Sequence, residues 1–122
     1  MKRRTPKFRV YDTLLKKIIN DNIFLGFENP EYIFMQYTDL KDINDVEVCE
    51  GDIVIYKKEM EHDDTFILMR TGIVEYESRL MAFGFRYNNK MREYVGLDII
   101  RDIEIIGNIY DNPELVSEFK NQ

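Results

Sequence analysis

The amino-acid sequence predicts a small, mostly β protein of antiparallel strands, with a short helical segment near its N-terminus and a short helical turn near its C-terminus. Its 122 residues include 15 Ile, 7 Val and 16 Phe plus Tyr but one Ala, so residues that favour pleated sheets far outnumber the best helix former. Short apolar runs alternate with turn-forming residues along the chain. Its length fits one domain over residues 1–122, beginning with a basic arm at about residues 1–7.

The N-terminal third carries the helical prediction. Residues 8–11 alternate apolar and polar side chains and lead into a turn at Asp12, as a short strand does. The next apolar residues are spaced for one face of a short helix, with Asp12 or Thr13 as its N-cap: Leu14, Leu15, Ile18 and Ile19. The run from Ile18 to Asn20 would equally begin a strand. Two further strands are expected at residues 23–25 and 32–37.

The remaining chain predicts strands separated by turns and one charged loop. Turns are expected at residues 41–45 and at the hairpin tip 88–90, and the loop at residues 57–64. The strands are expected at residues 46–48, 53–56, 66–69, 73–76, 80–87, 94–97 and 103–110. At the end, Asn112 is suited to cap a short helix whose first residue is Pro113 and which buries Leu115 and Phe119.

Charge is distributed unevenly along the chain. The net charge is −6, but residues 1–20 carry +6 and residues 21–122 carry −12. An acidic body repels nucleic acid, which disfavours binding over an extended face. The basic N-terminus is either a solvated terminus or a contact for phosphates or an acidic partner. The residues of that contact would be Lys2, Arg3, Arg4, Lys7 and Arg9.

The residue types needed for most familiar catalytic sites are scarce. The chain has one cysteine, Cys49, and one histidine, His62. This excludes a disulfide framework and a zinc site of several Cys and His ligands. The acidic residues around His62, in the segment 59–64, are contiguous and are interpreted as a solvated loop rather than converging metal ligands. Cys49 lies beside carboxylates and is interpreted as a packing residue, and residues 42–47 lack the glycine of a calcium loop. The prediction is therefore no catalytic residue, metal or cofactor, and no enzyme; a metal-dependent hydrolase using carboxylates is the weaker alternative.

Four motifs follow one another in a characteristic order. They are FRVYD at residues 8–12, MQYTDLKDINDVEVCEGDIV at 35–54, GIVEY at 72–76 and IEIIGNIYDNPEL at 103–115. Together they resemble the YopX family of phage and prophage proteins, whose patterns include Q-Y-T-G-L-K-D-x-N-G and E-G-D-I-V. Asp39 and Asp45 stand where those patterns have Gly, so both turns should use the left-handed conformation that Asp tolerates. The resemblance implies a small β-rich, barrel-like fold and a mobile-element origin, but no established activity.

The motif residues are interpreted as architectural. Glycines interrupt strands where a barrel bends, and their rhythm at Gly51, Gly72 and Gly84 is that of SH3-like barrels. An antiparallel, SH3-like barrel-type domain is therefore the expected fold. The proposed structural motif consists of Gly51, Asp52, Gly107, Asn108, Asn112 and Pro113.

These observations favour an accessory protein encoded by a phage or prophage that acts through protein–protein contact. No apolar run approaches 18 residues, and Met1–Arg4 is not followed by an apolar leader, so a cytoplasmic location in a bacterial host without membrane contact is expected. A basic head on an acidic body favours a homo-oligomer, and a host or phage protein is the other expected partner. The alternative is a nucleic-acid-associated protein that uses the basic arm and exposed aromatic side chains, although nucleic acid is not the favoured partner.

Overall fold

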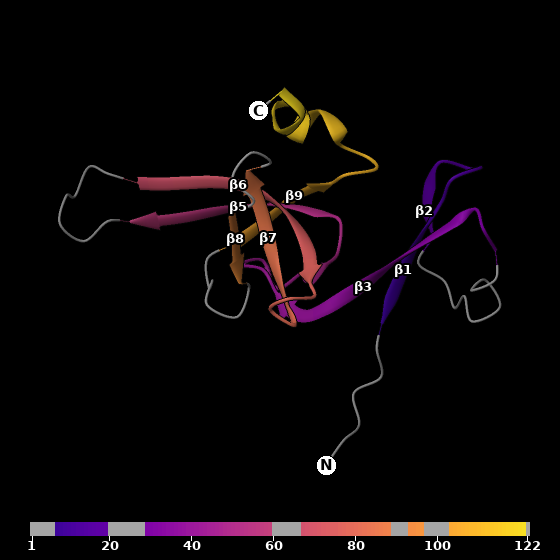
Figure 1. Cartoon of the computed structure of the whole chain (residues 1–122), viewed down its shortest axis with the longest axis horizontal. Helices are drawn as coiled ribbons and strands as arrows, with labels where there is room; N and C mark the ends of the chain where they lie inside the picture. Colours follow the sequence, from indigo (N-terminus) through magenta and orange to yellow (C-terminus); the bar gives the residue numbers. More distant parts are fainter. Residues whose placement is uncertain (1–6, 20–28, 60–66, 89–92, 97–102, 122) are drawn as a thin grey trace, which may run out of the picture.

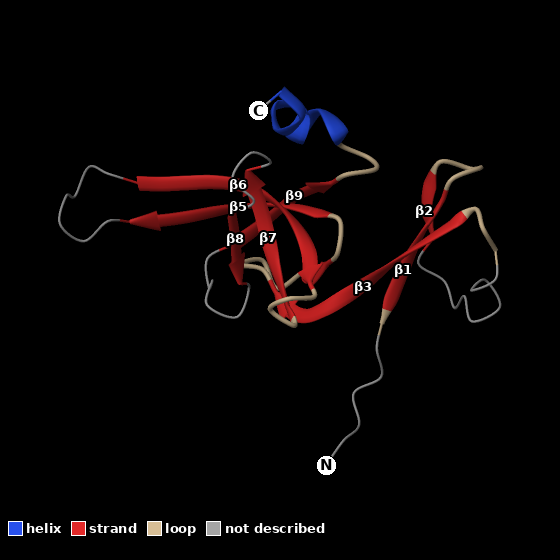
Figure 2. Cartoon of the chain, in the orientation of Figure 1, coloured by secondary structure: helices blue, strands red, loops and turns tan. Residues whose placement is uncertain are grey.

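Two antiparallel sheets form the protein in the computed structural model, which describes residues 7–19, 29–59, 67–88, 93–96 and 103–121 (Figures 1 and 2). The first sheet has the order β2-β1-β3-β4 and the second β8-β7-β6-β5-β9, and the sheets curl like part of a barrel. The first sheet comprises β1 (Phe8–Asp12), β2 (Lys17–Ile19), β3 (Tyr32–Lys41) and β4 (Glu47–Cys49). The second comprises β5 (Asp52–Glu59), β6 (Ile67–Glu77), β7 (Ala82–Asn88), β8 (Glu93–Gly96) and β9 (Ile103–Asn108). The predicted mostly β, antiparallel fold is thus confirmed.

The prediction of a helical segment near the N-terminus is wrong. Residues 17–19 form β2, which pairs with β1 in a hairpin, with Val10 opposite Ile19. Asp12 does cap the following residues, since its Oδ1 accepts hydrogen bonds from the amides of Leu14 (2.9 Å) and Leu15 (3.1 Å). The cap closes a tight turn in place of a helix, because Lys16 has a φ of 54° and reverses the chain. The β-branched residues Ile18 and Ile19 therefore pair with β1, although their spacing from Leu14 and Leu15 is that of a helix.

Several strand boundaries in the second sheet also differ from those predicted, and β9 ends at Asn108 rather than at residue 110. The expected strands at 66–69 and 73–76 are parts of one strand, β6, because Gly72 lies within it opposite Val54 and makes no turn. β5 continues through residues 57–59, where the charged loop was expected. β7 begins at Ala82 after a turn that ends at Met81, whose φ is 52°. The predicted strand at 23–25 and residues 89–90 of the predicted hairpin tip lie outside the described residues.

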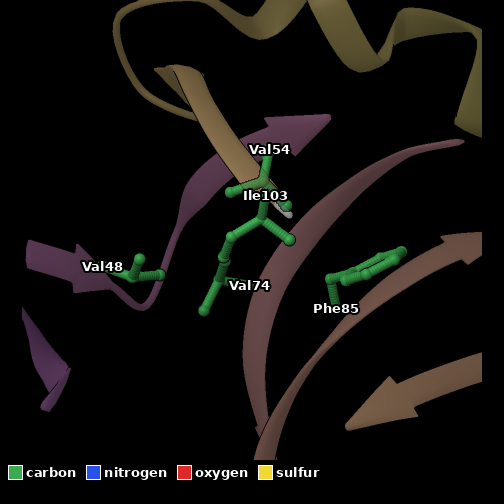
Figure 3. Close-up of a cluster of buried hydrophobic side chains, with 5 residues drawn as sticks. All are labelled: Val48, Val54, Val74, Phe85 and Ile103. Carbon is green, nitrogen blue, oxygen red and sulfur yellow. The ribbon is translucent and has the colours of Figure 1, made fainter. Parts of the chain in front are cut away.

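The main hydrophobic cluster joins the two sheets. Val48 of β4 packs with side chains of the second sheet, which are Val54, Val74, Phe85 and Ile103 (Figure 3). A second cluster unites Ile53 of β5 with Val116 of the C-terminal 3-10 helix, η3 (Pro113–Asn121). The predicted C-terminal helical turn is confirmed, but Leu115, predicted to be buried, is exposed, and Val116 is buried instead. The side chain of Phe119, the other residue predicted to be buried, lies outside the described residues. A kink at Val116 (φ −121°, ψ 16°) breaks the regular helical spacing on which that prediction depended.

The turn between β3 and β4 is held to the last strand of the second sheet. Asp39 and Asp45 have φ values of 68° and 65°, the left-handed conformation expected where related patterns have glycine. Asp42 is buried, and its carboxylate accepts amide hydrogen bonds from Asn44 (2.9 Å), Val46 (2.9 Å) and Ile105 of β9 (3.0 Å). The amide of Ile43 donates to the carbonyl of Ile103 (2.9 Å). The turn is therefore fixed internally and to β9.

Because of these hydrogen bonds, the stability of the protein should depend on the ionisation of Asp42. Burial by itself raises the pKa of this carboxyl, but the three amide donors outweigh it and hold the pKa below 3.8, its ordinary value. A carboxyl whose folded-state pKa is lowered stabilises the protein above its unfolded pKa and loses that contribution as the pH falls through the folded pKa.

We expect the urea midpoint of the wild-type protein to fall as the pH is lowered below about 4, and the Asp42→Asn variant to lack this part of the dependence. At neutral pH the variant should be less stable by about 1–2 kcal/mol, since Asn keeps one acceptor oxygen of two. Urea denaturation of both proteins at several pH values measures the difference. Parallel pH profiles would show that Asp42 does not make this contribution.

Candidate functional site

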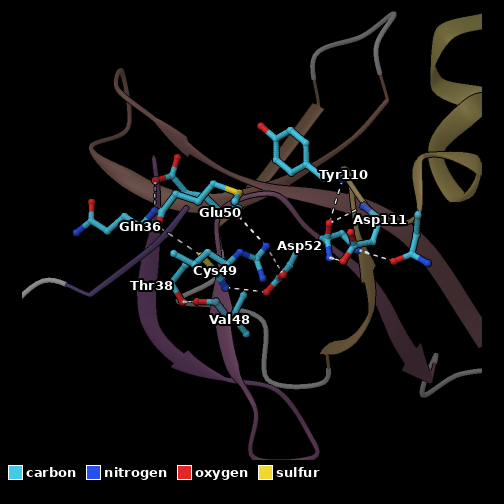
Figure 4. Close-up of polar contacts among 12 residues, drawn as sticks. Gln36, Thr38, Val48, Cys49, Glu50, Asp52, Tyr110 and Asp111 are labelled. Carbon is cyan, nitrogen blue, oxygen red and sulfur yellow. Dashed lines mark hydrogen bonds and ion pairs between the residues drawn. The ribbon is translucent and has the colours of Figure 1, made fainter. Parts of the chain in front are cut away.

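A buried polar junction fixes β1 to the connection between β4 and β5. Arg9 of β1 places Nη2 2.7 Å from Oδ1 of Asp52 and also donates from Nη2 to the carbonyl of Glu50 (3.1 Å). The other oxygen of Asp52 accepts the amide hydrogen bond of Cys49 (2.8 Å) (Figure 4). The Arg9 and Asp52 side chains are 11% and 3% exposed, and Nε of Arg9 is buried without a hydrogen-bond partner in the described parts of the chain. Arg9 is therefore bound within the fold, and the contact with a phosphate or an acidic partner stays a prediction.

The electrostatics of this junction are those of a structural site. Burial raises the pKa of Asp52, and the charge of Arg9 and the hydrogen bonds from Cys49 and Arg9 only partly offset it. Burial likewise raises the pKa of Cys49 to about 12, so its thiol stays protonated at neutral pH. Since the thiolate is the nucleophilic form of cysteine, a protonated and buried Cys49 is unsuited to covalent chemistry.

Of the other four residues predicted for the basic contact, the structure describes one, Lys7. Lys7 is exposed and forms an ion pair with Glu47 of β4 at 3.1 Å. Lys2, Arg3 and Arg4 lie outside the described residues. Of the five predicted residues, the structure thus describes Lys7 and Arg9, and each of them is paired with a carboxylate of the chain.

The residues of the family motif make turns and close contacts between strands. Gly51, with a φ of 85°, connects β4 to β5 and donates its amide hydrogen bond to Val74. Gly107 lies at a β-bulge, because it faces Ile53 whereas Ile105 faces the next residue of β5, so that Ile106 is the extra residue. A Cβ at Gly107 would lie 2.5 Å from Oδ1 of Asn112.

The segment after β9 is ordered by its own side chains. Oδ1 of Asn108 accepts the amide hydrogen bonds of Tyr110 (3.0 Å) and Asp111 (2.9 Å), and Oδ1 of Asn112 accepts that of Asn108 (3.2 Å). Pro113 then begins η3. The ring of Tyr110 stacks on Tyr11 of β1, with centroids 4.1 Å apart and an angle of 16° between the planes. With the Arg9–Asp52 ion pair, this stack is a second attachment of the N-terminal hairpin to the rest of the protein.

Exposed apolar side chains mark a surface that the sequence analysis missed. The hairpin of β1 and β2, with the first half of β3, extends away from the five-stranded sheet (Figure 1). At its turn Leu14 is 73% exposed and Leu15 62% exposed, and Lys16 and Lys17 follow them, both exposed. Residues 14–17 are called the basic turn below. Helical spacing had assigned both leucines to a buried face, and the signal for a turn was the cap at Asp12.

A second exposed surface lies at the opposite end of β3, in the segment 39–47, called the acidic tip below. Ile43 is 56% and Val46 50% exposed there, and Leu40 is also exposed. Four carboxylates and one ammonium group give the segment a formal charge of −3: Asp39, Lys41, Asp42, Asp45 and Glu47. The acidic tip thus combines apolar side chains with negative charge, whereas the basic turn combines them with positive charge.

Within the described residues, no group of three or more His, Cys, Asp and Glu side chains is placed to hold a metal ion. Most of the acidic cluster at 59–64 falls outside those residues. The described part of the chain also contains no helix that is long and apolar enough to cross a membrane.

Comparison with known proteins identifies relatives of the fold. The family model described as "YopX protein" matches residues 16–117. Among solved structures, the crystal structure of protein EF1440 from Enterococcus faecalis is similar, with a TM-score of 0.59 and 24% sequence identity. The similarity covers 93% of this chain and 99% of that chain, and at this identity it concerns the fold alone. None of the curated proteins matches the chain.

Proposed function

The chain belongs to the YopX family, and from this premise and its exposed basic turn we propose that it is a non-enzymatic protein-interaction module. It would act as an accessory protein of phage or prophage origin in the cytoplasm of a bacterial host. The observation that carries the proposal is the pair of adjacent leucines, 73% and 62% exposed, at the end of an extending hairpin. Burying a leucine side chain against a partner contributes about 1.5–3 kcal/mol.

The hairpin is suited to binding because its base is fixed. The Arg9–Asp52 ion pair and the stack of Tyr11 on Tyr110 attach β1 to the rest of the protein, and Asp12 closes the turn. A contact surface that is ordered before binding loses less conformational entropy in the complex. The same contacts disfavour the nucleic-acid alternative, because Arg9 is committed to a buried ion pair with Asp52.

Photo-crosslinking in bacterial cells tests the proposal. A photoreactive amino acid at position 15 should yield a defined protein adduct, whereas the same group at Ser117, which is exposed on η3, should not. Adding Leu14→Ser should reduce the adduct at position 15 by at least about fivefold, the ratio that corresponds to 1 kcal/mol, while leaving the thermal unfolding midpoint unchanged. Absence of an adduct at position 15, or equal adducts at both positions, would contradict the proposal.

A further inference from the structure

We propose that two copies of this chain associate in antiparallel orientation, the basic turn of each docking on the acidic tip of the other. This inference rests on the proposed function, since it assigns the partner of the same exposed leucines. The two surfaces match in both respects that matter for association: each presents exposed aliphatic side chains, and their charges are opposite in sign.

The length of β3 makes this contact intermolecular. Tyr32, the first residue of β3, pairs with Asp12 beside the basic turn, and Lys41, its last, pairs with Glu47 at the acidic tip. Ten residues of extended strand separate the two surfaces by about 30 Å. A chain therefore cannot dock its own turn on its own tip. Two antiparallel copies satisfy both contacts at once, as the two-fold symmetry of most dimers requires.

The acidic tip is ordered for such a contact. Asp42 accepts three amide hydrogen bonds within the turn and from β9, and the amide of Ile43 is bound to β9. Ile43 and Val46 are each about half exposed, and the backbone that carries them is held in place by these hydrogen bonds. Docking would bury these apolar side chains at little cost in backbone entropy.

Two ion pairs at the acidic tip are exposed to solvent and can exchange their partners. The ion pairs Lys7–Glu47 and Lys41–Asp45 are exposed, at 3.1 Å and 3.5 Å, and exposed pairs contribute little within the chain. Near the basic turn, the carboxylates of Glu31 and Asp12 accept hydrogen bonds from the turn's own donors, the hydroxyl of Thr13 (2.8 Å) and the amides of Leu14 and Leu15. The aliphatic contacts therefore supply the affinity, and the charges select the antiparallel orientation.

Charge reversal at each surface tests the proposal by light scattering coupled to gel filtration. One variant carries Leu15→Glu and Lys17→Glu, which change the basic turn from +2 to −1, and the other carries Ile43→Lys, Asp45→Lys and Glu47→Lys, which change the acidic tip from −3 to +2. The wild-type protein should show twice the 14.7 kDa mass of the chain at micromolar concentration and moderate salt. Each variant alone should show the mass of one chain, and their equimolar mixture should restore the doubled mass, because both of its contacts are again complementary.

Two controls separate the outcomes. Arg79→Glu reverses an exposed charge on the β6–β7 turn and should leave the doubled mass unchanged, and thermal unfolding establishes that all variants fold. A wild-type mass of 14.7 kDa, or a mixture that stays monomeric, overturns the antiparallel pair. If position 15 still crosslinks to another protein in that case, the interaction module stands and only its partner is wrong; if position 15 yields no adduct, both proposals fail.

Discussion

Replacing Asp52 with asparagine is expected to lower the free energy of unfolding by about 3–5 kcal/mol, the usual cost of removing one partner of a buried ion pair. Asparagine retains an oxygen that can accept the amide hydrogen bond of Cys49, so the change removes chiefly the negative charge. Arg9, which is 11% exposed, would then carry a buried charge without its carboxylate. Urea denaturation at neutral pH measures the loss.

A double-mutant cycle tests whether the unpaired charge of Arg9 causes this loss of stability. Arg9→Met combined with Asp52→Asn removes both charges, so it should be markedly more stable than the sum of the two single losses predicts. The raised pKa of Asp52 already indicates that burial penalises its charged form. Strictly additive losses would mean that packing, rather than an unpaired charge, accounts for the cost.

Gly72→Val is expected to cost about 3 kcal/mol, although valine is otherwise favoured in strands. A Cβ at this position would overlap the ring of Phe85, which is fully buried in the cluster that joins the two sheets. The ring therefore has no solvent-facing space into which to move. Thermal or urea unfolding of the variant measures the effect, with Thr71→Val as the neighbouring control that should change stability by less than about 0.5 kcal/mol.

The second variant in this experiment makes room for the new side chain. In a Phe85→Leu background, the same Gly72→Val substitution should cost less, because the atoms that a Cβ would meet are partly removed. An unchanged cost in that background would attribute the effect to the backbone of β6 instead of the ring of Phe85.

Composition and turn residues were enough to predict the β class, and the family pattern was enough to predict the left-handed turns at Asp39 and Asp45. Both depend on local preferences that neighbouring residues do not override. The errors arose where a distant residue decides the local structure. Gly72 resembles a break in the sequence, but it is the position in a continuous strand that admits the ring of Phe85.

The candidate site shows the same limit. Arg9 belongs to a basic run and therefore resembled a solvated contact residue, because its partner Asp52 lies 43 positions later and no local pattern reveals the pairing. Leu14 and Leu15 were assigned to a helix face because a turn and a helix both begin with the cap at Asp12. The SH3-like arrangement of the strands, expected from the spacing of glycines, stays a prediction.

The attachment of the β3–β4 turn to β9 determines when the protein can fold during its synthesis. Asp42 and Ile105 are 63 positions apart, and β9 is also the strand that borders β5 in the five-stranded sheet. While the ribosome is still translating residues 43–102, the carboxylate of Asp42 lacks its donor from β9 and β5 lacks one of its two neighbours. Contacts of such sequence separation form slowly. The nascent chain therefore exposes unpaired strand edges until residues 103–108 leave the ribosome, and such edges favour aggregation over that interval.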